Sequence, residues 1–314
     1  RVVNGKVIIG NGGAEYAVRG YVTAYDTATG KQAWRFYTVP GEPGKKDGEI
    51  SDEPLETLAR KTWFGDTYWK GGGGGTAWDS IVYDKEMNRL YIGVGNGAPH
   101  SHYKRSQAKG DNLFLASIVA VDPDTGKYLW HYQENPGDSW DYTSVQPIVL
   151  ADLPIDGATR KVIMHAPKNG FFYVIDRATG KPISADAYVA GIRWAKGIDP
   201  KTWRPIDAEG NRYIDKPFLN SPGVAGAHNF QPMAYSPDTK LVYIPTSQNY
   251  WAYKANEAPA HGIPPPSPDM PKPDNYLQAW DPVARKSVWR VQADNARLDV
   301  GGGDDRSPSG AQGG

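Results

Sequence analysis

The sequence predicts an all-β fold made of repeated four-stranded antiparallel sheets, the construction of part of a β-propeller. Three observations support this prediction. Gly (36 residues) and Pro (26 residues) form about a fifth of the 314-residue chain, as expected where tight turns are frequent. Aromatic residues make up 12% of the chain, with 11 Trp and 19 Tyr, which indicates a packed core and not a disordered chain. The third observation is an internal repeat.

The repeat consists of an apolar strand, an Asp, a turn that contains Thr-Gly, and a second strand that ends in Trp. Complete copies occupy 24–34 and 120–130, whereas the copy at 174–181 lacks the Trp and the copy at 279–289 lacks the Thr-Gly. The Asp side chain can accept hydrogen bonds from turn N–H groups, and Gly can take the positive φ that reverses the chain. The Trp is suited to packing between adjacent sheets. We therefore predict a hairpin at each copy, in preference to four coincidental matches.

Short apolar segments before each copy supply the other strands of each sheet. They lie at 7–9; 78–83 and 90–94; 145–150 and 162–166; and 231–235 and 241–245, ahead of hairpins at 116–132, 171–176 and 277–291. Four strands per unit, repeated radially, form a propeller blade. The chain then holds about three and a half blades, and because a ring usually takes four to eight, we expect it to be part of a larger propeller.

Longer connections interrupt the pattern. We predict a short helix over 52–62, because Leu55, Leu58, Ala59 and Thr62 have helical spacing. Pro- and Gly-rich segments at 182–228 and 250–274 are predicted to be loops. We expect one domain over 1–291 and a disordered or artefactual tail over 292–314, where no strand pattern is present.

Composition excludes several classes of protein. Lys and Arg total 35, as do Asp and Glu, so there is no electrostatic reason to expect a nucleic acid or an anionic membrane as partner. The absence of Cys excludes disulfides, zinc–thiolate sites and a CxxCH haem attachment within these residues. No apolar run is long enough for a transmembrane helix. The first ten residues are strand-like and lack Met, so we expect a processed chain or an internal piece of a longer one.

Polar residues gather in the loops that should open on one face of the blades. In an antiparallel blade, the loop before the first strand and the loop after the second strand share a face. Glu15 and Asn96 could offer oxygen ligands to a hard ion such as Ca²⁺, and Asp141 could act as a base. Turn capping is the alternative role for such residues. The two loop types together carry Glu15, Thr76, Trp78, Asn96, Asp141, Lys168 and Asn229.

These segments resemble the pyrroloquinoline quinone (PQQ)-dependent alcohol dehydrogenases, above all the ethanol-type and quinohaemoprotein branches. The resemblance covers about 1–291 and is strongest in GNGGAEYAVRG (10–20), GGGTAWDS (73–80), LYIGVGNGAP (90–99), GDNLFLASIVAVD (110–122), PGDSWDYTSVQP (136–147) and APKNGFFYVID (166–176). It implies about half of an eight-bladed propeller. The adjacent cysteine pair of that family is absent here, and Thr143 stands where lanthanide-using relatives carry Asp, which favours Ca²⁺.

The resemblance also implies roles for individual residues. Glu15 and Asn96 match the carboxylate and amide ligands of Ca²⁺, and Asp141 matches the catalytic base at the same ion. The residues that match contacts to PQQ are Gly13, Ala14, Thr76, Trp78, Lys168 and Asn229. The implied cofactors are PQQ and Ca²⁺, with haem c in a further C-terminal domain.

The function implied by the resemblance is periplasmic oxidation of small primary alcohols to aldehydes. The hydride passes to the quinone, Asp141 takes the proton, and electrons leave to a cytochrome c. An aldose or polyol quinoprotein dehydrogenase is the second possibility, and a non-catalytic PQQ-like propeller scaffold is the third. A scaffold would not need the site residues together, which favours the enzyme.

Other motifs carry weaker signals. His100 and His102 have no evident third ligand, so no metal site is predicted at them. The glycines of 71–75 lack the GK[ST] ending of a phosphate loop, and those of 93–97 lack the GxGxxG spacing of a nicotinamide site. We expect Trp34, Trp130 and Trp289 to be buried between blades.

Overall fold

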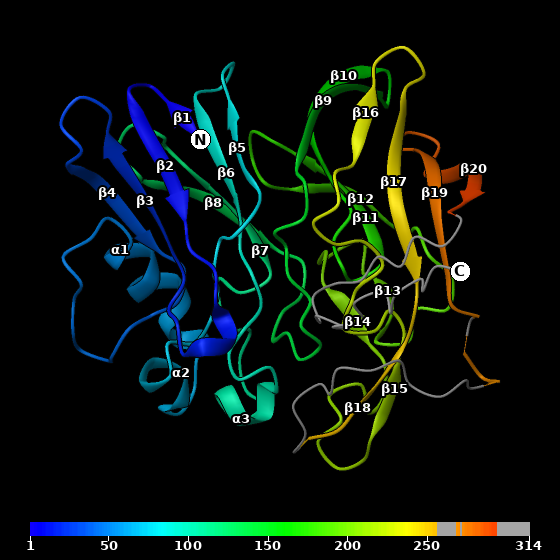
Figure 1. The fold of residues 1–314 in the computed structure, drawn as a ribbon, viewed down its shortest axis with the longest axis horizontal. Helices are drawn as coiled ribbons and strands as arrows, with labels where there is room; N and C mark the ends of the chain where they lie inside the picture. Colours follow the sequence, from blue (N-terminus) through cyan, green and yellow to red (C-terminus); the bar gives the residue numbers. More distant parts are fainter. Residues whose placement is uncertain (256–267, 271, 294–314) are drawn as a thin grey trace, which may run out of the picture.

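The computed structural model describes residues 1–255, 268–270 and 272–293. It contains four four-stranded antiparallel sheets, which confirms the predicted all-β, propeller-like fold (Figure 1). Their strands are β1 (Val2–Val3), β2 (Lys6–Gly10), β3 (Tyr21–Asp26) and β4 (Gln32–Tyr37); β5 (Ile81–Asp84), β6 (Arg89–Gly93), β7 (Ser117–Val121) and β8 (Tyr128–Gln133); β9 (Val149–Ile155), β10 (Ala158–His165), β11 (Phe171–Asp176) and β12 (Pro182–Ala187); and β16 (Ala234–Ser236), β17 (Leu241–Gln248), β19 (Asp274–Asp281) and β20 (Lys286–Gln292).

The predicted count of three and a half blades is corrected to four. The two-residue strand β1 pairs with β2 and completes the first sheet, and such a short strand has no period that a sequence pattern could reveal. Three predicted first strands also begin too early. β5 begins at Ile81, β9 at Val149 and β16 at Ala234, because the residues before them belong to the loops that enter each sheet.

The repeated turns form as the sequence predicts. Asp26 Oδ1 accepts hydrogen bonds from the backbone N of Ala28 (3.1 Å) and Thr29 (2.8 Å) and from Thr29 Oγ1 (2.8 Å), and Gly30 has a φ of 68°. The turns that begin at Asp122 and Asp176 repeat this arrangement. The local Asp–Gly pattern therefore closes each hairpin without help from the rest of the chain.

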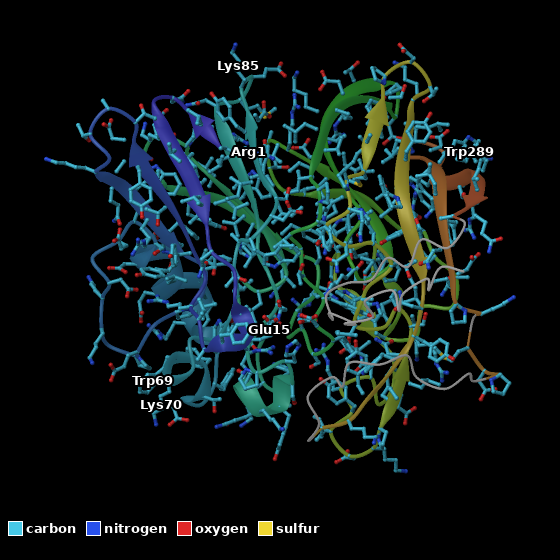
Figure 2. The ribbon with its side chains drawn as sticks, viewed as in Figure 1. Arg1, Glu15, Trp69, Lys70, Lys85 and Trp289 are labelled. Atoms are coloured by element: carbon cyan, nitrogen blue, oxygen red, sulfur yellow. The ribbon has the colours of Figure 1, made fainter. Side chains whose placement is uncertain are left out.

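The Trp residues pack from one sheet onto the next. Trp34 and Trp130 are 4% and 8% exposed. A Cβ added to Gly126 would lie 2.6 Å from Trp34, and one added to Gly180 would lie 2.4 Å from Trp130. Each indole thus covers the turn glycine of the following sheet. Trp289 was predicted to be buried as well, but it is 40% exposed at the outer side of the fourth sheet (Figure 2), because no further sheet follows β20 in the described residues.

The connections contain more regular structure than predicted. The expected helix forms over 52–62 as three consecutive helical turns, α1 (Asp52–Pro54), η2 (Leu55–Ala59) and η3 (Arg60–Thr62), with Leu55 and Ala59 buried. Two short helices, α2 (Thr67–Lys70) and α3 (His102–Ser106), and a 3₁₀ turn, η1 (Ala14–Tyr16), were not predicted.

The prediction of loops at 182–228 and 250–274 is partly wrong, because the first segment begins with β12 and the two segments also form two small two-stranded sheets. β13 (Ala195–Ile198) pairs with β14 (Pro205–Asp207), and β15 (Phe218–Asn220) pairs with β18 (Trp251–Tyr253). Buried aromatic side chains, including Trp194, hold them against the core between the second and third sheets. The high Pro and Gly content hid these strands from the sequence pattern. The predicted tail over 292–314 lies outside the described residues except for 292 and 293. Within those ranges, no helix has the length and apolar character needed to span a membrane.

A partly buried histidine on β8, His131, makes stability depend on pH. Burial lowers the pKa of His131 to about 4, and the Tyr128 hydroxyl lies 2.8 Å from its Nδ1. The imidazole of the unfolded chain has a pKa near 6.5, so between pH 6.5 and 4 the unfolded chain binds more protons than the folded one. The contribution of His131 to the free energy of unfolding is therefore complete above about pH 6.5 and is lost as the pH falls toward 4. We expect the loss from this group to reach about 3 kcal/mol. Urea titrations at pH 7.5 and 4.5 should show a smaller pH dependence for His131→Gln than for the wild type, and equal dependences would contradict the assignment.

Candidate functional site

The loop between β2 and β3 carries Glu15 on the turn η1. Gly13 before it has a φ of 87° and Ala17 after it a φ of 56°, so the loop bends sharply on both sides of Glu15. Its carboxylate side chain is half exposed. The same loop approaches Trp78, since a Cβ added to Gly12 would lie 3.7 Å from the Trp78 Cβ. The loop therefore brings the predicted metal ligand and the predicted cofactor contact to one region.

The glycine run at 71–75 packs backbone against backbone. A Cβ added to Gly74 would lie 2.5 Å from the Asn96 carbonyl oxygen, and the Gly75 N donates to that oxygen at 2.8 Å. The Gly95 N donates in turn to the Thr76 carbonyl at 3.0 Å. The run thus sets Thr76 beside Asn96, because side chains would prevent this close approach.

Glu15 and Asn96 are in direct contact although 81 residues separate them. Asn96 Nδ2 donates to Glu15 Oε1 at 3.2 Å, so the amide nitrogen faces the carboxylate. Binding of a cation by both residues would require the amide to turn over and present Oδ1, since only the oxygen can be a ligand. Asn96 is buried and its position is fixed by the loop after β6.

Asp141 lies in the loop after β8 in a left-handed backbone conformation, with a φ of 64°. Asp138 shapes this turn, because its Oδ1 accepts hydrogen bonds from the backbone N of Trp140 (3.2 Å) and Tyr142 (3.1 Å). Complete burial raises the pKa of Asp138 to about 6, against the opposing effect of Arg105. Asp138 was not among the predicted site residues; its spacing of three residues from Asp141 was the available signal.

A buried polar network also holds the loop that carries Asp141. Glu134 and His165 are both fully buried, and Glu134 Oε1 lies 2.8 Å from His165 Nδ1. Ser144 Oγ donates to the other Glu134 oxygen at 2.6 Å, and His165 Nε2 lies 3.1 Å from the Gln146 carbonyl. These contacts, which were not predicted, tie the segment after Asp141 to β10.

Lys168 binds Asp141 directly. Its ammonium nitrogen lies 3.0 Å from Asp141 Oδ2 and 3.0 Å from the Asp141 carbonyl oxygen, and its side chain is only 6% exposed. A Cβ added to Gly226 would lie 2.2 Å from Lys168 Cγ, and the Ala227 N donates to the Lys168 carbonyl at 2.9 Å. The loop that leads to Asn229 therefore packs along Lys168.

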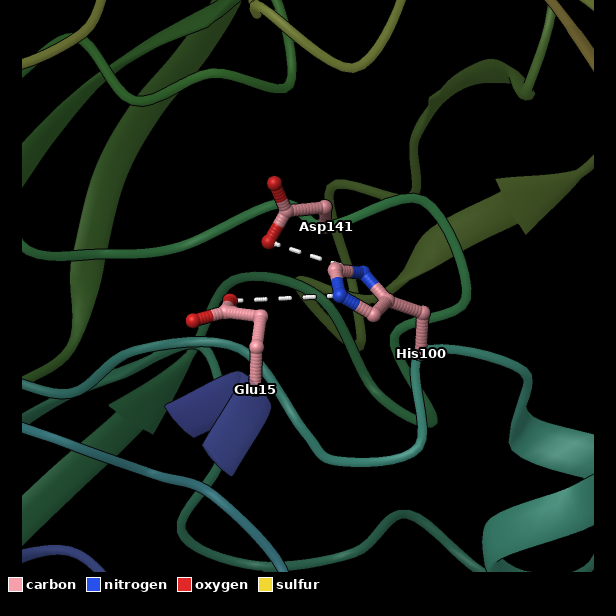
Figure 3. A group of neighbouring side chains, drawn as sticks. All are labelled: Glu15, His100 and Asp141. Carbon is pink, nitrogen blue, oxygen red and sulfur yellow. Dashed lines mark ion pairs between the residues drawn. The ribbon is translucent and has the colours of Figure 1, made fainter. Parts of the chain in front are cut away.

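His100 stands between Glu15 and Asp141. Its Nε2 lies 3.9 Å from Glu15 Oε1, and its Nδ1 lies 3.7 Å from Asp141 Oδ1 (Figure 3). The sequence offered no evident third ligand beside His100 and His102, whereas the fold brings Glu15 and Asp141 from distant loops within reach of His100. His102 takes no part: it is buried against the Lys109 carbonyl, and burial lowers its pKa to about 3.

Contacts join four of the seven predicted side chains. Asn96 contacts Glu15, His100 lies between Glu15 and Asp141, and Asp141 pairs with Lys168. The loop before Glu15 lies beside Trp78. Trp78 is 40% exposed. Among the described residues, the buried side-chain atoms without a hydrogen-bond partner include Thr76 Oγ1, His100 Nδ1 and Asn229 Oδ1. Such atoms fit a region that a polar ligand completes, because buried polar groups are rarely left unpaired.

A separate cavity of about 380 Å³ lies outside this region. It is bordered by the ion pair of Arg204 with Asp111 and that of Arg212 with Asp207, and it includes none of the predicted site residues.

Comparison with known proteins assigns the family. The β-propeller domain model of the PQQ-dependent glucose/ethanol/alcohol dehydrogenases matches residues 1–186. The chain belongs to this family. The resemblance drawn from the sequence motifs is therefore confirmed.

Relatives in the PQQ-dependent family match most of the chain. A quinohemoprotein alcohol dehydrogenase of Pseudomonas putida, ADH-IIG, is 55% identical over 313 residues, covering 93% of this chain and 43% of its own length. The crystal structure of the Comamonas testosteroni quinohemoprotein alcohol dehydrogenase aligns with a TM-score of 0.85 at 49% identity, covering 93% of this chain and 46% of that one. A europium-containing methanol dehydrogenase aligns with a TM-score of 0.76 at 31% identity, covering 93% and 53%. The chain thus spans about half the length of these relatives.

Proposed function

We propose that this chain carries the PQQ- and Ca²⁺-binding site of an enzyme that oxidises primary alcohols to aldehydes. The observation that supports it most is the meeting of Glu15, Asn96, Asp141 and Lys168 from four separate loops in a member of this family. The relatives named above are alcohol dehydrogenases, which favours this substrate class over sugars and over a non-catalytic scaffold.

The residues present fit both groups. Trp78 is 40% exposed and offers an indole for a planar ring system, and Thr76 Oγ1 and Asn229 Oδ1 are polar atoms without partners. Gly13 and Ala14 would approach the cofactor through their backbone. Glu15, Asn96 and Asp141 offer the oxygen ligands that Ca²⁺ prefers, once the Asn96 amide presents its oxygen. When bound, PQQ supplies a quinone that accepts the hydride equivalent, chemistry that no side chain provides.

Asp141 is the proposed general base. Lys168 holds Oδ2 and the carbonyl oxygen of Asp141, which orients the carboxylate. The other oxygen, Oδ1, points toward His100 and Glu15 and has no hydrogen-bond donor within the described residues. A carboxylate oxygen has two lone pairs, so Oδ1 can face the ion and still accept the proton of an alcohol hydroxyl bound beside it, which is what general base catalysis requires. Lys168 in turn would stand beside the quinone oxygens.

The proposal extends to the electron acceptor and the compartment. Electrons would pass to a cytochrome c in the periplasm, and haem c would belong to a further domain, in line with the quinohemoprotein names of the relatives. Thr143, two residues after Asp141, adds no third carboxylate, which favours Ca²⁺ over a trivalent ion.

Reconstitution tests the proposal. The full-length gene product is purified without cofactors, loaded with PQQ and Ca²⁺, and assayed by dye-linked oxidation of ethanol and of an aldose. We expect PQQ- and Ca²⁺-dependent ethanol oxidation. Activity on the aldose alone would support the polyol alternative, and failure to bind PQQ would support the scaffold.

Removing the charge of Glu15 should weaken Ca²⁺ binding. We expect Glu15→Gln to reduce Ca²⁺ affinity at least about tenfold, because an amide replaces one of the anionic ligands at similar size. Isothermal titration with Ca²⁺ measures the change. Glu49→Gln is the control, because the Glu49 carboxylate accepts a hydrogen bond from Gln32 and is not a predicted site residue. Equal Ca²⁺ affinities in the two variants would exclude Glu15 as a ligand.

A further inference from the structure

Glu15, His100 and Asp141 differ from an all-oxygen calcium site in one respect, the imidazole. We propose that His100 is a metal ligand and that these three side chains bind a first-row divalent transition ion such as Mn²⁺. The inference rests on the metal role proposed above for Glu15 and Asp141. It goes further by assigning a nitrogen ligand, and with it a different class of preferred ion.

The distances suit a single ion. Taking one ligand atom from each residue, all three atoms lie within 4.8 Å of one another. Ligands about 2.0–2.4 Å from one ion are separated from each other by roughly 3–4.5 Å, so small rotations would bring the three into contact with it. Only one ring nitrogen can bind. Nδ1 is the candidate, because it lies 3.7 Å from Asp141 Oδ1, is buried and has no hydrogen-bond partner.

Asp141 has one oxygen available for the ion. Lys168 already pairs with Oδ2 at 3.0 Å, whereas Oδ1 faces the imidazole. In Figure 3 the side chains of Glu15, His100 and Asp141 converge from three separate parts of the backbone. Two carboxylates and one imidazole therefore lie within reach of one ion, and Lys168 holds the other oxygen of Asp141.

A buried arginine fixes the backbone on both sides of this group. The Arg105 guanidinium is completely buried and donates to the carbonyl oxygens of Pro99 (2.6 Å) and His100 (2.9 Å). It also donates to the carbonyl oxygen of Asp138 (2.6 Å), in the loop that carries Asp141. One side chain thus ties the His100 loop to the Asp141 loop, so the ligands are held in place before an ion arrives and less entropy is lost on binding.

The chemistry of the donors sets the preference. Ca²⁺ is a hard ion that takes oxygen ligands, whereas divalent first-row transition ions also accept imidazole, Mn²⁺ with the lowest affinity of that series. We therefore expect the protein without PQQ to bind Mn²⁺ more tightly than Ca²⁺, and to lose that preference when the imidazole is removed.

The test uses Mn²⁺ as the probe and magnetic resonance as the readout. Purified protein without PQQ is titrated with Mn²⁺, and the bound ion is studied by electron spin echo envelope modulation. We expect one bound Mn²⁺ with modulation from an imidazole ¹⁴N. His100→Gln should abolish the ¹⁴N modulation and weaken Mn²⁺ binding at least about tenfold, while leaving Ca²⁺ affinity within about twofold. His131→Gln, which removes a histidine remote in the fold, should keep the signal.

The outcomes separate this inference from the proposed function. Mn²⁺ bound without ¹⁴N modulation in the wild type overturns the assignment of His100, even if the Gln variant fails to fold. If Ca²⁺ still binds and Glu15→Gln weakens it, the proposed calcium site stands and only the imidazole ligand is lost. If neither ion binds without PQQ, the assignment of His100 fails, and the reconstitution with PQQ and Ca²⁺ decides the proposed function separately.

Discussion

Asp141→Asn is expected to lower kcat of the PQQ- and Ca²⁺-loaded enzyme about 10³-fold, within the range for loss of a general base. The physical reason is local: the amide cannot take the proton that Oδ1 of the carboxylate would accept. Backbone strain does not explain such a loss, because Asn tolerates the left-handed conformation that Asp141 adopts at a φ of 64°. Initial rates of ethanol oxidation with an artificial dye measure the effect.

Two measurements make the result specific to Asp141. PQQ binding, followed by its absorbance, should stay within a few-fold of wild type, since most proposed cofactor contacts come from other residues. Asp156→Asn changes a carboxylate in the exposed turn between β9 and β10 and should leave kcat unaltered. Full activity of Asp141→Asn would remove the proposed base from the mechanism.

Gly180→Ala is expected to destabilise the protein by about 3 kcal/mol, the largest effect on folding proposed here. The added Cβ would lie 2.4 Å from Trp130, so the indole that joins the second and third sheets must move. Overpacking of this kind costs about 1–3 kcal/mol. The left-handed backbone at Gly180, with a φ of 74°, adds about 1 kcal/mol for any residue with a Cβ. Urea denaturation monitored by Trp fluorescence measures the total.

Gly30→Ala is the matched control for this prediction. Gly30 occupies the same position of the same turn in the first sheet, with a φ of 68°, and no described atom lies within 4 Å of a Cβ added there. We expect it to cost about 1 kcal/mol, the backbone part alone. The difference between the two variants then isolates the contact with Trp130. Equal losses would mean that the indole does not hold the sheets together through the turn.

The hairpins were predictable because their signals are local. Asp26, Asp122 and Asp176 each accept hydrogen bonds from residues two and three positions later, so five or six residues contain the whole cause. The helix over 52–62 is another local pattern, in which the apolar residues face the core at helical spacing. The two-stranded sheets at β13–β14 and β15–β18 were missed, because their strands depend on aromatic packing against distant parts of the chain.

The positions of the site residues followed from topology, but their contacts did not. Loop positions in the repeat predicted that Glu15, Asn96, Asp141 and Lys168 would share a face. Which atoms meet depends on glycine backbones that pack without side chains and on the buried Arg105, which joins two loops. The orientation of the Asn96 amide and the position of His100 could not be read from spacing, since neighbours far apart in the chain determine both.

By itself, the sequence determined the sheet repeat, the turn chemistry and the set of polar side chains available at one end of the blades. These depend on short-range hydrogen bonding and on the alternation of residues along a strand, which a linear pattern records. Tertiary structure alone decided that Trp289 is exposed, that Lys168 pairs with Oδ2 of Asp141, and that the His100 imidazole lies near Oδ1 of the same residue. Those outcomes depend on close packing between segments that are 27 or more residues apart in the chain, where a shift of about 1 Å changes which atoms are partners.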